Sequence, residues 1–100
     1  MNDTSAAYLN QARLLTAATL RGLPVKVFLF GSRASGTAGR CSDIDIALLP
    51  ADVLPTSVVK ELRERLEESH IPYRVDVVDL TLAEPALRQR VLTEGVPWSD

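Results

Sequence analysis

The sequence lacks the features that mark several common protein classes. It has one cysteine, Cys41, so no disulfide can form within the chain. It has no apolar run long enough to cross a membrane and no secretory signal. Its 11 Lys and Arg residues against 13 Asp and Glu residues give a formal net charge of -2, which argues against general binding to nucleic-acid backbones. We therefore expect a cytoplasmic protein that associates with neither membranes nor nucleic acid in general.

What remains is the composition of an ordinary globular protein. Apolar residues make up 46% of the chain and charged residues 24%, values typical of folded domains. One hundred residues are enough for one hydrophobic core, although a small one. The sequence contains no repeats, no low-complexity segment and no internal linker. We therefore expect residues 1–100 to form a single domain.

Segments with helix and strand patterns alternate along the chain. A first helix is predicted from a cap at Asp3, Thr4 or Ser5 to about Arg21. Strands are predicted over 25–30, 43–49 and 73–80, further helices over 56–69 and 84–94, and a short helical turn near Ser32. This order predicts an α/β (α+β) fold, in which helices pack on a small mixed β-sheet.

Particular residues mark the boundaries and the core. Gly22 and Gly95 are predicted to end helices, and Pro50 and Pro55 to bound a loop. In the helix predicted over 56–69, the residues of the expected buried stripe are Val58, Leu62 and Leu66. Trp98 is interpreted as a hydrophobic anchor, either onto the core of this chain or onto a partner.

Two aspartates, Asp43 and Asp45, lie one residue apart at the start of the strand predicted over 43–49. Side chains at positions i and i+2 of a strand point to the same face, about 6.5–7 Å apart at the backbone. Two carboxylates this close repel each other unless a cation or a donor lies between them. A hard divalent ion such as Mg²⁺ suits this pattern, because it binds a few carboxylate oxygens together with phosphate oxygens.

The strand predicted over 73–80 offers a third carboxylate. Arg74, Asp76 and Val78 share one face of this strand, whereas Asp79 lies on the other face, at a strand end where polar residues commonly start turns. If the two strands pair side by side, Asp76 can add a third ligand. We therefore place Asp76, and not Asp79, in the site, with Arg74 as its neighbour and ion-pair candidate.

Gly31 and Ser32 follow the first predicted strand. A glycine at this point lets the backbone approach a ligand closely. If a helical turn starts at Ser32, its free N–H groups form an anion site, to which the Ser32 hydroxyl and the charge of Arg33 contribute. A phosphate cradle facing a metal pair predicts chemistry on a nucleoside triphosphate, by attack on the α-phosphate or on another phosphoryl group.

These residues resemble a known family. Gly31-Ser32, followed after ten residues by Asp43-Ile44-Asp45, is similar to the signature of the DNA polymerase β-like nucleotidyltransferase superfamily. Within it, the chain resembles the minimal nucleotidyltransferase (MNT) antitoxins, which are paired with HEPN-domain toxins. The resemblance covers nearly the whole chain and implies the nucleotidyltransferase fold. It also implies that Asp43, Asp45 and Asp76 are catalytic and bind two Mg²⁺ ions, with Mn²⁺ as an alternative.

The resemblance further implies a substrate and a partner. Gly31, Ser32 and Arg33 would bind the phosphates of ATP. The chain would then be a Mg²⁺-dependent protein adenylyltransferase, which transfers AMP to a tyrosine of its HEPN ribonuclease toxin and neutralises it within a hetero-oligomer. Two alternatives stay open: a non-catalytic antitoxin that acts by binding alone, and a nucleotidyltransferase that acts on a small molecule or on RNA.

Overall fold

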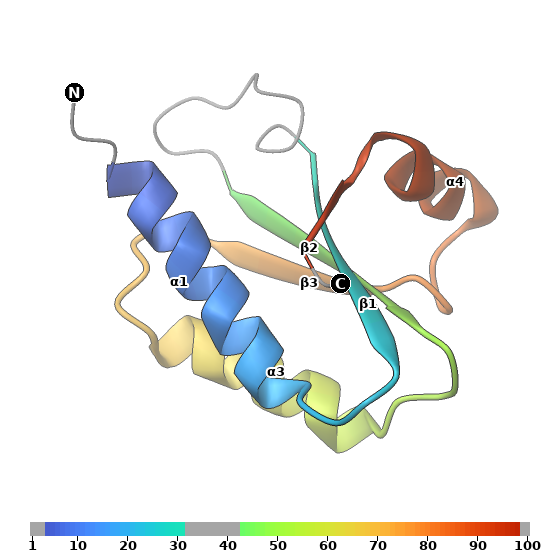
Figure 1. The fold of residues 1–100 in the computed structure, drawn as a ribbon, viewed down its shortest axis with the longest axis horizontal. Helices are drawn as coiled ribbons and strands as arrows, with labels where there is room; N and C mark the ends of the chain where they lie inside the picture. Colours follow the sequence, from blue (N-terminus) through green and yellow to red (C-terminus); the bar gives the residue numbers. More distant parts are fainter. Residues whose placement is uncertain (1–3, 32–42, 99–100) are drawn as a thin grey trace.

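Helices and strands alternate in the computed structural model, which describes residues 4–31 and 43–98 (Figure 1). In chain order, the elements of this part of the chain are α1 (Thr4–Thr19), β1 (Val25–Phe30), β2 (Ile44–Pro50), α3 (Thr56–Glu68), β3 (Val75–Asp79), α4 (Pro85–Glu94) and β4 (Val96–Pro97). None of these helices is long and apolar enough to span a membrane.

The four strands form one mixed sheet in the order β3-β2-β1-β4. β1 runs antiparallel to both β2 and β4, whereas β2 and β3 are parallel. A parallel pair needs a crossover connection, and α3 supplies it. Helices α1 and α3 cover one face of the sheet and α4 covers the other, as Figure 1 shows. The predicted fold of helices on a small mixed sheet is confirmed.

The central strand β2 is buried on both faces. Ile44, Ile46 and Leu48 are fully buried and pack with the apolar residues of α1 and α3. Ala47 points the other way and packs in a second cluster with Val91 of α4. β2 therefore supports both layers of the structure, and its position fixes the side chains at its ends.

The first helix is shorter than predicted. It ends at Thr19, and residues 20–22 form a turn that Gly22 completes with a φ of +83°. The predicted role of Gly22 is confirmed, because this φ is unfavourable for any residue with a side chain. The hydroxyls of Thr16 and Thr19 donate to carbonyl oxygens four residues earlier.

The second strand extends beyond its predicted end at 49 and includes Pro50, and the loop that follows lies between Pro50 and Pro55, as predicted. Pro50 lies in β2 opposite Val25 of β1. On β2, the N–H of Ile44 donates to Arg74 and the carbonyl of Leu48 accepts from Leu80, so these backbone groups face β3. Every second residue of a strand faces the same neighbour, so the backbone of Pro50 also faces the β3 side. β3 has ended at Asp79, opposite Leu48, and no ladder partner needs the N–H that proline lacks.

The structure differs from the prediction in the bounds of β3, in one buried residue of α3 and in an additional strand. β3 begins at Val75 and ends at Asp79, so it is shorter than the predicted 73–80. In α3, Val59 is buried, whereas Val58 is only partly so. The strand β4 was not predicted; its two residues pair with Phe28 and Leu29, and Trp98 donates its N–H to the carbonyl of Val27.

Leu62 tests the contact between α3 and the sheet, because it is fully buried. Replacing it with alanine should lower the free energy of unfolding by about 2–5 kcal/mol, through lost burial and a residual cavity. Leu82 is 86% exposed and is the matched control, for which the same replacement should change stability by no more than about 0.5 kcal/mol. Urea denaturation measures both, and equal losses would show that the packing is misplaced.

Candidate active site

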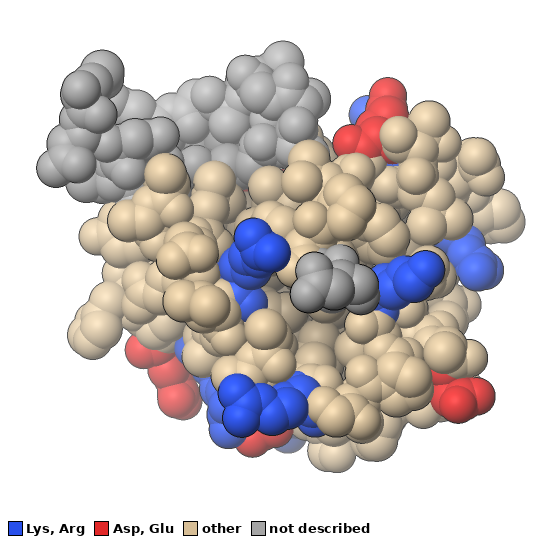
Figure 2. Space-filling model, in the orientation of Figure 1, with Lys and Arg blue, Asp and Glu red and all other residues tan. Residues whose placement is uncertain are grey.

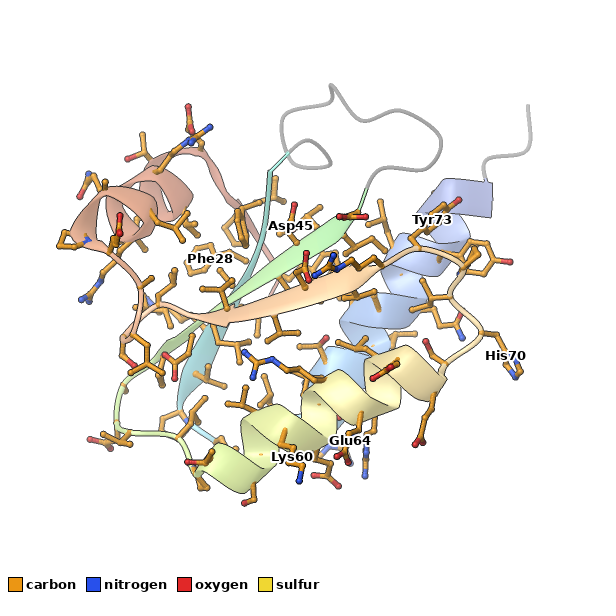
Figure 3. All side chains as sticks on the ribbon, turned by 180° about the vertical axis from the view of Figure 1, so that it is seen from behind. Phe28, Asp45, Lys60, Glu64, His70 and Tyr73 are labelled. Carbon is orange, nitrogen blue, oxygen red and sulfur yellow. The ribbon has the colours of Figure 1, made fainter. Side chains whose placement is uncertain are left out.

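Asp45 and Asp76 lie directly side by side on the parallel strands β2 and β3. The register pairs Asp45 with Asp76, and neighbouring strands are about 4.8 Å apart. Because Ile44 and Ile46 point into the core beneath α1 and α3, Asp45 projects from the opposite face of the sheet (Figure 3). Asp43 precedes β2 and is exposed. The predicted meeting of the carboxylates from two strands is therefore found for Asp45 and Asp76.

Arg74 pairs with one of these acids, as the sequence predicted. Its Nε donates to Oδ1 of Asp76 over 3.1 Å. The side chain of Arg74 is 75% exposed and that of Asp76 is 40% exposed, so solvent weakens the pair. Asp76 is thus held at the surface by a contact that another cation can replace.

Asp45 has an unusual electrostatic environment. Burial raises the pKa of Asp45 above its ordinary value of 3.8, the negative charges of Asp76 and Asp43 raise it further, and Arg74 partly opposes them. The ionised form of Asp45 is therefore disfavoured when no cation is present. A cation between Asp45 and Asp76 would reduce the repulsion between the two carboxylates and would compensate for the hydration that Asp45 loses on burial.

Gly31 brings the end of β1 against the carboxylate of Asp45. Its φ is +75°, and a Cβ at this position would lie 2.5 Å from Oδ2 of Asp45. No side chain fits there unless Asp45 moves. The sequence predicted that Gly31 lets the backbone approach phosphates, but it did not predict the contact with Asp45. This contact depends on the φ angle of Gly31 and on the register that places Phe30 opposite Asp45, and neither can be inferred from the sequence.

Other predicted residues fall into two groups. Ser32, Arg33 and Cys41 lie outside the described residues, as does the predicted helical turn near Ser32. Asp79 accepts hydrogen bonds from the N–H and the hydroxyl of Thr81 through Oδ1. Its interpretation as a turn residue is therefore confirmed.

The acidic groups fit a hard divalent cation that phosphate also coordinates. Within 4–31 and 43–98, no three His, Cys, Asp or Glu side chains converge closely enough to enclose a metal ion by themselves. Mg²⁺ does not require such a cage, since one or two carboxylates with substrate phosphates and water suffice. Asp45 and Asp76 supply two neighbouring carboxylates, and the pKa of Asp45 is raised by burial first and then by the negative charges of Asp76 and Asp43.

Residues 18–97 match the model of the family described as polymerase beta nucleotidyltransferases. The chain belongs to this family. It is 46% identical over 69 residues to the protein adenylyltransferase MntA of Shewanella oneidensis, a match that covers 69% of this chain and 49% of MntA. The chain spans about half the length of the curated relatives it matches.

Solved structures of the family have the same fold. A toxin–antitoxin structure with AMP-PNP is 38% identical, with a TM-score of 0.69, and the match covers 87% of this chain and 72% of that one. A structure of the tri-AMPylated Shewanella oneidensis HEPN toxin with MNT antitoxin is 33% identical, with a TM-score of 0.68, and covers 94% and 71% of the two chains. The nucleotidyltransferase fold expected from the motif is thereby confirmed.

The contact of Gly31 with Asp45 can be separated from its backbone conformation. Gly22 has a similar positive φ, but a Cβ there would meet nothing within 4 Å. Gly22→Ala should lower the free energy of unfolding by roughly 1–2 kcal/mol, because alanine is strained at this positive φ. Gly31→Ala should cost more and should also weaken ATP binding, because the carboxylate of Asp45 must move. Urea denaturation and ATP titration compare the two variants, and equal behaviour would remove Gly31 from the site.

Asp45 is predicted to destabilise the metal-free fold near neutral pH. Because the pKa of Asp45 is raised in the folded state, stability falls as the pH rises from its ordinary value of 3.8 through the folded pKa. Asp45→Asn should therefore raise the free energy of unfolding at about pH 7, and this gain should shrink towards about pH 4. Denaturation in chelator-treated buffer at both pH values measures it. A loss of stability at neutral pH would contradict this electrostatic picture.

Proposed function

We propose that this chain transfers AMP from ATP to a tyrosine of a HEPN ribonuclease toxin and thereby neutralises the toxin. The observation that carries the proposal is the pair Asp45 and Asp76, side by side on one face of the sheet, with Gly31 against the carboxylate of Asp45. The relatives support it, since MntA is named a protein adenylyltransferase and one structure holds a tri-AMPylated HEPN toxin.

Each residue has a role in this proposal. Asp43, Asp45 and Asp76 would hold the divalent ions, two Mg²⁺ or alternatively Mn²⁺, and the ions would supply positive charge to the phosphate oxygens. Gly31 leaves room for the triphosphate beside Asp45, and Ser32 and Arg33 donate to its oxygens. The tyrosine oxygen bonds to the α-phosphorus of ATP, the bond to the β,γ-pyrophosphate breaks, and the phenolic proton is lost to solvent.

The acceptor is supplied by another polypeptide. In the described part of the chain the sheet has four strands, and its two edge strands are short: β3 has five residues and β4 has two. A sheet of this size provides little surface to form a pocket for a second substrate. A tyrosine presented by a partner protein needs no such pocket. We therefore propose a hetero-oligomer with the toxin, working in the cytoplasm.

Binding without catalysis is the main alternative function. The side-by-side carboxylates argue against it, because a repulsive pair that has no role would be readily replaced. Transfer to RNA is less favoured, since the formal net charge of -2 opposes binding to a phosphate backbone. Transfer to a small molecule finds no support in the two cavities beside α1, since neither Asp45 nor Asp76 lines either of them.

Asp76→Asn distinguishes the enzyme from the binder. The variant should lose AMP transfer at least about a hundredfold, because replacing groups that only support a metal ligand already costs 10–100-fold. Complex formation with the toxin should persist. Intact-mass analysis of the co-expressed toxin measures transfer in steps of one AMP, and co-purification measures the complex.

The matched control is Asp79→Asn, on the same strand but in the turn with Thr81. It should keep transfer close to the parental rate while losing some stability. Full neutralisation of the toxin by Asp76→Asn, with no AMP on the toxin in any sample, would refute the enzymatic proposal in favour of the binder.

A further inference from the structure

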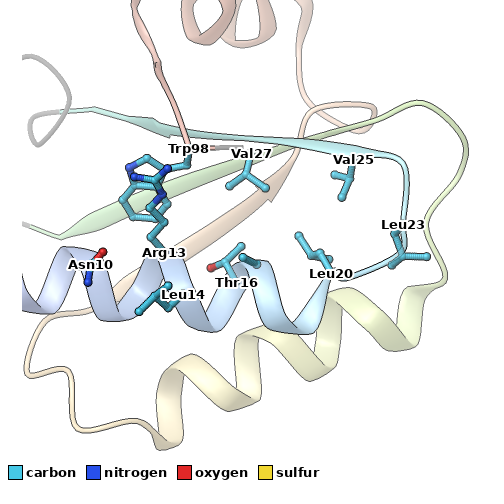
Figure 4. A pocket seen from close by; sticks show the side chains of 10 residues that line it. Asn10, Arg13, Leu14, Thr16, Leu20, Leu23, Val25, Val27 and Trp98 are labelled. Atoms are coloured by element: carbon cyan, nitrogen blue, oxygen red, sulfur yellow. The ribbon is translucent and has the colours of Figure 1, made fainter. Parts of the chain in front are cut away.

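A groove of about 440 Å³ separates α1 from β1 on the side of the sheet away from Asp45 (Figure 4). Leu20, Val25 and Val27 contribute apolar side chains to it, and Trp98 forms one wall. Leu14 also lines it and is 62% exposed. Leu20 and Val27 are buried, so Leu14, Val25 and Trp98 provide the apolar surface that is at least partly open to solvent, on the opposite face of the sheet from the candidate active site.

The groove lies in a basic part of the molecule. No acidic residue occurs between Asp3 and Asp43, and the described part of that stretch carries Arg13, Arg21 and Lys26. Arg13 lines the groove, and Arg21 follows the lining residue Leu20. In Figure 2, which has the orientation of Figure 1, basic side chains lie near the middle of this face and acidic ones towards its outline.

These cations have no acidic partners among residues 4–31 and 43–98. The ion pairs of this part of the chain join Arg65, Arg74 and Arg90 to acids, and none involves Arg13, Arg21 or Lys26. Within the described parts of the chain, Arg13 and Arg21 therefore carry positive charge that no acid balances, beside the groove. The surface matches a ligand that presents carboxylates next to apolar side chains.

We propose that this groove docks an acidic segment with an apolar face on the partner protein, which on the proposed function is the HEPN toxin. Its apolar side chains would fill the space between α1 and Trp98, and its carboxylates would pair with Arg13 and Arg21. Because the groove and Asp45 lie on opposite faces, docking holds the toxin without covering the site of transfer.

A protein segment fits this surface better than the other occupants. Single-stranded RNA binds to several aromatic side chains that stack successive bases, whereas Trp98 is the one aromatic residue in the lining and its neighbours are aliphatic. A second copy of this chain offers Val53 and Leu82 as exposed apolar residues close to acids, but each of them is a single side chain. Its acidic helix α3 is the longest alternative. The buried apolar residues of that helix are Val59, Leu62 and Leu66, so it has no exposed apolar row to place in the groove.

The test compares two double variants with the same change of charge. Arg13→Glu with Arg21→Glu changes the groove, and Lys60→Glu with Arg88→Glu changes α3 and α4; all four residues are exposed and make no ion pair within the described parts of the chain. Affinity is measured for a ribonuclease-inactive form of the cognate HEPN toxin, at two salt concentrations. ATP affinity and AMP transfer are measured on the same samples.

The groove variant should bind the toxin at least about tenfold more weakly than the parent, with a smaller salt dependence. The control pair should stay within about threefold, and ATP affinity should not change in either. Leu14→Ser tests the apolar contribution; this residue is already 62% exposed, so the variant should weaken toxin binding without loss of stability.

The outcomes separate this inference from the proposed function. A parent that binds toxin but adds no AMP refutes the proposed function, and the groove is still judged by the two pairs. Equal toxin affinity in both pairs, or no toxin binding by the parent, overturns the groove proposal. The groove proposal is also overturned if light scattering shows that the parent is a dimer and that only the groove variant is a monomer. The same holds if the parent binds RNA and only the groove variant does not.

Discussion

The repulsion between Asp45 and Asp76 is the constraint around which the site is organised. Two parallel strands place these carboxylates next to each other; burial disfavours the ionised form of Asp45 most, and the charge of Asp76 disfavours it further. Among residues 4–31 and 43–98, Arg74 is the cation that offsets this charge, through an exposed ion pair with Asp76 that solvent weakens. A cation bound between these carboxylates would stabilise the ionised form of Asp45, which is what the proposed metal-dependent phosphoryl chemistry requires.

One strand provides both the stability and the site. In β2, Ile44, Ile46 and Leu48 are fully buried beneath α1 and α3, and Asp45 between them faces the other way. Sliding β2 by one residue would expose the core and bury the acid, so its register is strongly determined. Because Gly31 closes against Asp45 at the end of β1, the carboxylate and the neighbouring backbone are fixed together.

Much of this could be predicted from the sequence, because local patterns determine it. The apolar run from Val25 to Phe30 is β1 at its predicted boundaries, and the alternation after Asp43 correctly placed Asp45 on the face opposite the buried isoleucines, whereas Asp43 lies before the strand. The errors came from long-range contacts. Pro50 continues a strand because β3 has ended beside it, and β4 is too short for any periodicity to indicate.

The site was predicted in part for the same reason. The sequence indicated that Asp76 could join Asp45 if their strands paired, but only the register shows that the two are direct neighbours. The contact of Gly31 with Asp45 depends on a positive φ. A glycine allows this φ, but its presence in the sequence does not show that it adopts it. The groove beside Trp98 is formed by α1, β1 and the residue after β4, which are distant in sequence.

The central claim is that the face carrying Asp45 and Asp76 holds a divalent cation together with ATP. Anomalous diffraction from crystals grown with Mn²⁺ and a non-hydrolysable ATP analogue tests it most directly. The account predicts an Mn²⁺ peak in contact with carboxylate oxygens of Asp45 and Asp76, and the triphosphate beside Gly31. A peak elsewhere, or a nucleotide on the face covered by α1 and α3, would contradict it.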